Sequence, residues 1–90
     1  MKKQTNIIYT KHVLEKMSLL KQLGWVITKS KIKKTIVKPT WSGVSKHGEF
    51  TAMDMMKDTH ILRVIFNREG DKIKVITVHV ARRGRYESTL

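Results

Sequence analysis

Hydrophobic residues recur at helical spacing in the first part of the chain, after one short β-prone run at residues 6–9. Thr10 follows this run, and its hydroxyl is suited to cap the free backbone N–H groups of a helix start. We therefore expect a helix that begins near Lys11 and has Gly24 as its C-cap. The apolar stripe of this helix consists of Val13, Leu14, Met17 and Leu20.

A second helical pattern follows the first after a short connection. Its start signal is Thr28 or Ser30, and it ends before Pro39, since proline cannot continue a helix. The apolar positions that this helix turns inward are Ile32, Ile36 and Val37. The rest of its surface is almost wholly basic.

The remaining pattern has the two-residue period of β-strands. Extended pieces are expected at residues 40–44 and 49–56, with glycines bounding a turn between them. Residues 60–66 and 72–80 flank a turn at 67–71 and predict a β-hairpin whose strands are apolar on both faces, as in the middle of a sheet. The predicted order is β-α-α-β-β-β-β. This is an α+β fold with two N-terminal helices packed on an antiparallel sheet of four to five strands.

Composition limits the chain to one core and points to anionic partners. The 90 residues carry 19 Lys and Arg against 7 Asp and Glu, a formal net charge of +12. A chain of this length forms a single domain over residues 1–90. Such an excess of positive charge attracts polyanions, so nucleic acid is the first partner to consider, with an anionic membrane surface as the alternative. The absence of cysteine excludes thiol chemistry and thiolate metal sites.

The sequence contains no apolar run of signal-peptide or membrane-spanning length. We therefore expect a cytoplasmic protein without a membrane partner. It also lacks a glycine-rich phosphate loop, a Gly-x-Ser-x-Gly elbow and a His-Glu-x-x-His motif, which excludes the enzyme classes that depend on them.

The densest group of candidate phosphate ligands follows the last predicted strand. Three arginines lie within four positions here, and guanidinium groups bind phosphate in a bidentate manner. They are Arg82, Arg83 and Arg85. The neighbouring Tyr86 can stack on a base or donate a proton. The alternative is that these are solvated residues of a loose C-terminal segment.

Two histidines are candidate proton carriers. His12 lies within the first turn of the first helix, where the positive end of the helix dipole favours a neutral imidazole that can act as a base, with Glu15 near enough to orient it. The alternative is a partly exposed histidine that only packs against the sheet. His79 lies between Val78 and Val80, a pattern more typical of a core histidine, so it ranks below His12.

The second helix offers a lysine ridge, by which we mean Lys29, Lys31, Lys33 and Lys34. It provides affinity for a nucleic-acid backbone without base readout, although such charge runs are as often only a solvated helix face. Asp54, Asp58 and His60 have no diagnostic metal-ligand spacing, so we expect no metal and no cofactor. Three nearby methionines are expected to fill the core.

Several segments occur together in a familiar order. Residues 9–17, 62–66, 75–78 and 81–87, with Pro39 after the second helix, resemble a small uncharacterised-domain family related to the RelE/ParE-like and BrnT-like toxins of type II toxin–antitoxin systems.

The opening of that family is a threonine or serine, one residue, a histidine, and a methionine five residues later. Thr10, His12 and Met17 occupy these positions here. The family's Arg-Gly-Ile link between the helices is replaced by residues 23–27, which contain no arginine. We therefore assign residues 23–27 none of the functions that this link has in the family.

The resemblance implies a RelE-like toxin fold, whose better-known relatives cleave messenger RNA, commonly in the ribosome, and are neutralised by a small acidic antitoxin. We therefore expect a metal-independent endoribonuclease in which His12 is the base and Tyr86 stacks or acts as an acid. The expected phosphate-stabilising residues are Arg63, Arg83 and Arg85, and the expected RNA-binding residues are Arg82 and the lysine ridge. The alternatives are a non-catalytic RNA-binding module and a toxin that inhibits a protein target, as the gyrase-directed relatives do.

Overall fold

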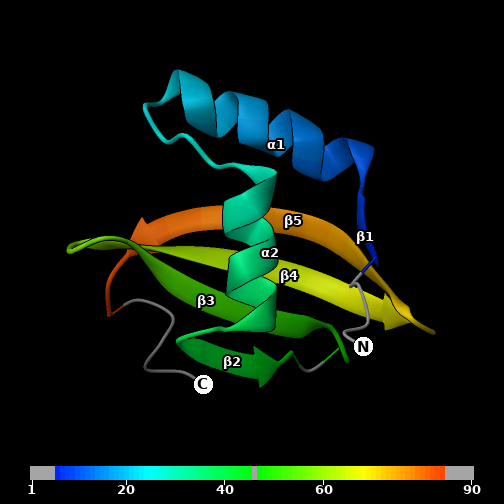
Figure 1. The fold of residues 1–90 in the computed structure, drawn as a ribbon. Helices are drawn as coiled ribbons and strands as arrows, with labels where there is room; N and C mark the ends of the chain where they lie inside the picture. Colours follow the sequence, from blue (N-terminus) through cyan, green and yellow to red (C-terminus); the bar gives the residue numbers. More distant parts are fainter. Residues whose placement is uncertain (1–5, 46, 85–90) are drawn as a thin grey trace.

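The computed structural model describes residues 6–45 and 47–84 and has two helices and five strands (Figure 1). The elements are β1 (Asn6–Tyr9), α1 (Lys11–Gln22), α2 (Lys29–Val37), β2 (Trp41–Val44), β3 (Phe50–Lys57), β4 (His60–Glu69) and β5 (Lys72–Arg82). The predicted α+β class and the predicted element order are confirmed.

The five strands form one sheet in the order β1-β5-β4-β3-β2. The β2–β3, β3–β4 and β4–β5 pairs are antiparallel, whereas β1 runs parallel to β5, with Ile7 opposite Ile73. The sheet is therefore mixed rather than purely antiparallel. The predicted hairpin of β4 and β5 occupies its middle, as its apolar faces require.

Both helices begin at the predicted capping residues. The hydroxyl of Thr10 accepts a hydrogen bond from the Val13 N–H, and the hydroxyl of Thr28 accepts one from the Lys31 N–H. The C-cap of α1 is Leu23 rather than Gly24, which follows it at φ 93°, a left-handed conformation that glycine adopts without strain.

The two helices and one face of the sheet enclose the core (Figure 1). Helix α1 lies along β5, and α2 crosses β3 and β4. The buried core residues are Val13, Leu20, Ile27, Ile32, Ile36, Ala52, Leu62, Val64, Phe66, Ile73, Val75 and Val78. Within the described residues, neither helix is long and apolar enough to cross a membrane.

Some predicted details are wrong. Leu14 and Val37 were placed on inward faces, but they are 44% and 53% exposed, because they lie beside rather than on the i, i+3, i+4 stripes that face the sheet. Gly43 lies inside β2 rather than at a turn. Residues 67–69 continue β4, so the hairpin turn contains only Gly70, at φ 63°, and Asp71.

Candidate functional site

The face of the sheet turned away from the helices, here called the second face, carries one row of residues from four strands. In this row Trp41 of β2 lies opposite Met53 of β3, Met53 opposite Arg63 of β4, and Arg63 opposite His79 of β5. Directly opposed residues share a face of the sheet. The row therefore brings an indole, a guanidinium and an imidazole onto one surface.

The start of α1 adds a second imidazole at the β5 edge of this row. The Thr10 hydroxyl donates a 2.8 Å hydrogen bond to the Val75 carbonyl and so fixes the first turn of α1 beside β5. His12 is the second residue of α1, and its Nε2 atom lies 3.2 Å from the Oγ1 atom of Thr77. Thr77 is two residues before His79, so both are on the second face.

Lys16 completes this group from the next turn of α1. It lies four residues after His12, and residues at that spacing share one side of a helix. We call His12, Lys16, Arg63 and His79 the histidine cluster. Its members come from the first helix and from the two central strands of the sheet.

The environment of His79 favours its neutral form. Burial lowers the pKa of His79 below its usual value, and the nearby positive charges of Lys16, Arg63 and His12 lower it further. The side chain is only partly buried. Among the described residues, none forms a hydrogen bond with this ring. These effects favour the unprotonated imidazole of His79, which is the form that can accept a proton.

The two predicted arginines at the end of β5 lie away from the histidine cluster. Arg82 and Arg83 line a pocket of about 740 Å³ at the end of the sheet. From Thr77, which contacts His12, to Arg83, just past the end of β5, the chain advances by six residues, roughly 20 Å. Arg83, which we expected to act with His12 on one phosphate, is thus placed at a second location on the same sheet.

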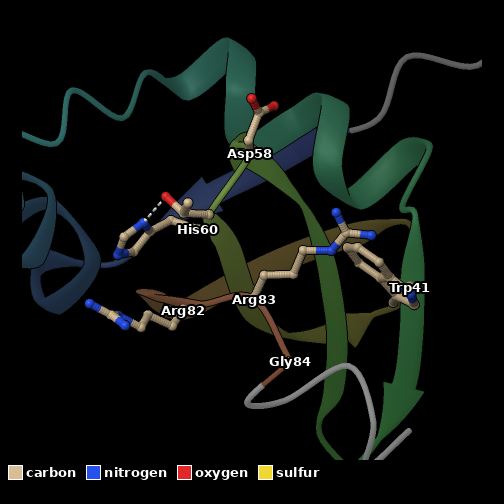
Figure 2. Close-up of a pocket in the computed structure, with 7 residues that line it drawn as sticks. Trp41, Asp58, His60, Arg82, Arg83 and Gly84 are labelled. Atoms are coloured by element: carbon tan, nitrogen blue, oxygen red, sulfur yellow. Dashed lines mark hydrogen bonds between the residues drawn. The ribbon is translucent and has the colours of Figure 1, made fainter.

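Figure 2 shows how the pocket is built. Arg83 extends toward Trp41, whereas Arg82 extends on the other side of the strand, the side of His60. The remaining lining residues are Asp58, Thr59, His60 and Gly84. The pocket therefore combines an aromatic ring with two guanidinium groups.

The lysine ridge is not a uniform row of solvated charges. The Nζ atom of Lys31 lies 3.1 Å from a carboxylate oxygen of Asp54 and donates a 2.8 Å hydrogen bond to the Met55 carbonyl. The Nζ atom of Lys29 lies 5.1 Å from the centre of the Tyr9 ring. Lys33 and Lys34 are exposed. Half of the ridge therefore ties α2 to the sheet.

The Asp54 carboxylate is part of this tie. Burial alone would raise the pKa of Asp54, but hydrogen bonds from Thr40, Lys31 and the Met55 N–H, with the charge of Lys31, lower it overall. Asp54 thus helps to hold α2 on the sheet and does not form a site with Asp58 and His60. Within residues 6–45 and 47–84, no group of three or more acidic or histidine side chains is arranged to hold a metal ion.

Two predicted site residues, Arg85 and Tyr86, lie outside the described residues. Of the remaining predicted residues, the structure places His12 and Arg63 near His79 and adds Lys16 to this group. The signal for His79 was present in the strand period: it alternates with Val78 and Val80, so it faces away from the core that they line.

Comparison of the chain with protein-family models, with curated proteins and with solved structures finds no match. The resemblance to the RelE/ParE-like and BrnT-like toxins therefore stays a prediction. The histidine cluster and the pocket are argued from their own geometry.

Proposed function

We propose that this protein is a metal-independent endoribonuclease that cleaves RNA at the histidine cluster. The observation that supports this proposal is the meeting of His12 and His79 beside Arg63 and Lys16. Two imidazoles can move protons on either side of a reacting phosphate, and fixed cations stabilise the charge that develops on it. The net charge of +12 supports a polyanionic substrate.

The residues have distinct roles in this mechanism. Neutral His79 takes the proton of a ribose 2′-hydroxyl, and the 2′-oxygen attacks the adjacent phosphorus. Arg63 and Lys16 stabilise the negative charge of the five-coordinate phosphorus centre. The bond from phosphorus to the 5′-oxygen breaks as His12 gives that oxygen a proton. The products are a 2′,3′-cyclic phosphate and a 5′-hydroxyl, and the imidazoles exchange protons with water before the next cycle.

Our proposal assigns one role differently from the expectation based on the sequence. His12 was the expected base, but burial and the neighbouring positive charges lower the pKa of His79 and so favour the unprotonated ring that a base needs, and we assign the base role to His79. His12 is exposed on α1 and held by Thr77, so it is in place to protonate the leaving oxygen. Arg83 is left for binding rather than for stabilising the reacting phosphate.

The test is cleavage of labelled RNA, free and on translating ribosomes, in the presence of a metal chelator. We expect cuts with cyclic phosphate ends, and none at a position whose ribose lacks the 2′-hydroxyl. His79→Gln and His12→Gln are each expected to slow cleavage about 100- to 10,000-fold. The matched control is His47→Gln, which makes the same substitution at an exposed histidine between β2 and β3.

A folded wild-type protein that cuts neither substrate would overturn the proposal. RNA binding without products would instead support the binding-module alternative. Cleavage that survives both histidine substitutions would show that another site carries the reaction.

A further inference from the structure

The pocket at the end of β5 has the composition of a nucleotide-binding site. The indole of Trp41 offers a flat apolar surface, on which any nucleobase can stack. Arg83, which extends toward Trp41, offers a guanidinium for a phosphate (Figure 2). A base and a phosphate are the two parts of a nucleotide, and the pocket has one suitable group for each.

Contacts within the chain fix the part of the pocket wall formed by Thr59, His60 and the backbone of Arg83. The backbone N–H of Arg83 donates a 2.8 Å hydrogen bond to the carbonyl of Thr59, which joins the end of β5 to the β3–β4 turn. The Thr59 hydroxyl lies 2.8 Å from the Nδ1 atom of His60, whose ring packs 4.7 Å from the Trp25 ring. A preorganised pocket loses less conformational entropy on binding.

The position of the pocket relates it to the histidine cluster. Trp41 belongs to the same row of the second face as Arg63 and His79. Arg83 follows His79 by four residues, roughly 13 Å along the chain. A short stretch of one single-stranded RNA is long enough to reach from one location to the other.

We propose that this pocket binds one nucleotide of a single-stranded RNA, with its base on Trp41 and its phosphate on Arg83, next to the nucleotide that reacts at the histidine cluster. The choice of RNA as the ligand rests on the proposed function. Asp58 also lines the pocket, and its negative charge opposes phosphate binding there. Because stacking tolerates every base, the pocket selects for an unpaired base and not for a sequence.

The test measures binding separately from cleavage. The protein carries His79→Gln, so that the RNA stays intact, and Trp25→Phe, so that Trp41 is the remaining tryptophan. A short single-stranded RNA is expected to quench the fluorescence of Trp41, and the same RNA in a duplex is expected to quench it much less.

Substitutions in the pocket give the second measurement, the affinity for labelled RNA. Trp41→Leu is expected to weaken binding about tenfold, and Trp41→Phe to weaken it less, because a ring is kept. Arg83→Gln is expected to weaken binding and to lower the slope of log affinity against log salt by about 0.7. Asp58→Asn is expected to strengthen binding.

The matched control is Arg68→Gln, which removes the same charge from a site far from the pocket. Arg68 lies near the end of β4, whereas the pocket lies beside the start of β4. If Arg83→Gln and Trp41→Leu bind RNA no more weakly than Arg68→Gln, and RNA leaves the Trp41 fluorescence unchanged, the pocket proposal is wrong. The two proposals fail separately. If the pocket binds RNA but the wild-type protein never cuts it, only the nuclease proposal is wrong. If the pocket variants cleave and bind RNA as the wild type does, only the pocket proposal is wrong.

Discussion

Arg63 of β4 and His79 of β5 lie directly opposite each other in the antiparallel pair, so a guanidinium and an imidazole share one position of the second face. Like charges at opposed positions of a sheet repel each other. The protonated form of His79 is therefore disfavoured by a neighbour that the strand register fixes. Burial is the largest cause of the lowered pKa of His79, and the charges of Lys16 and Arg63 lower this pKa further.

Removing the charge of Lys16 is expected to raise the pKa of His79. Lys16→Gln takes away one of the positive charges that lower this pKa, but burial, the largest cause, remains. The pKa should therefore move only part of the way back toward the usual value. An NMR titration of the histidine ring protons measures it, with Lys21→Gln in the last turn of α1 as the control. Equal pKa values of His79 in the two variants would contradict this electrostatic account.

The Lys31–Asp54 pair is expected to stabilise the fold rather than to bind a ligand. The Asp54 side chain is only 14% exposed, and Asp54→Asn removes the charged acceptor from three donors. We expect this variant to lose about 1–3 kcal/mol of unfolding free energy at neutral pH. Urea denaturation measures the loss, and Lys31→Met tests the partner.

The acid dependence of this contribution has a definite sign. Because the pKa of Asp54 is lower in the folded chain than in the unfolded chain, its contribution is fully present above the unfolded value of 3.8. It is lost as the pH falls from there through the folded pKa. Wild type and Asp54→Asn should therefore converge in stability in strong acid, and a constant gap would refute the assignment.

The two capping threonines are expected to differ in their importance. Thr28 only caps α2, so Thr28→Ala should cost about 1 kcal/mol. Thr10 caps α1 and also donates a hydrogen bond to the Val75 carbonyl, so Thr10→Ala should cost about 2 kcal/mol. Thermal unfolding of both variants gives the comparison. Equal losses would show that the bond from Thr10 to β5 contributes nothing.

Core packing is tested by two aliphatic residues of α2. Ile32 is fully buried, so Ile32→Ala is expected to lose about 2–5 kcal/mol of unfolding free energy. Val37 is 53% exposed, and Val37→Ala should change stability by less than about 0.5 kcal/mol. Chemical denaturation distinguishes these values. A large loss of unfolding free energy in Val37→Ala would show that Val37 is buried, as the sequence pattern suggested.

Local patterns allowed most of the fold to be predicted. Thr10, Thr28 and Pro39 mark helix boundaries because capping and chain-breaking act within a few residues. The hairpin of β4 and β5 follows from apolar alternation on both sides of Gly70. The parallel pairing of β1 with β5 was not predictable in this way, because its partners are more than sixty residues apart and no short pattern specifies them.

The inward side of α2 shows a second reason for errors. Thr35 rather than Val37 faces the core, with Ile32 and Ile36 on either side. A polar residue is tolerated there because the Thr35 hydroxyl donates a 2.8 Å hydrogen bond to the Lys31 carbonyl. Hydrophobicity alone favoured Val37, but the helical period places position 35 on the buried stripe.

The candidate site was only half visible in the sequence. His12 and Arg63 were named, but their meeting depends on the register that sets Arg63 opposite His79 and on the anchoring of α1 to β5. The separation of Arg63 in the histidine cluster from Arg83 in the pocket likewise depends on the length of β5, because Arg83 lies past its end. The spacing of residues along the sequence does not specify how far apart these side chains lie in the folded chain.

The pairing of β1 with β5 also determines when the sheet can become complete during synthesis of the chain. The first strand and α1 leave the ribosome early, but the strand that Ile7 and Tyr9 pair with, and on which Val13 packs, is made after the other four strands of the sheet. Until residues 72–82 emerge, this N-terminal segment has no partner for its apolar side. The histidine cluster joins the two segments, so a nascent chain that stops short of β5 contains His12 but no assembled cluster.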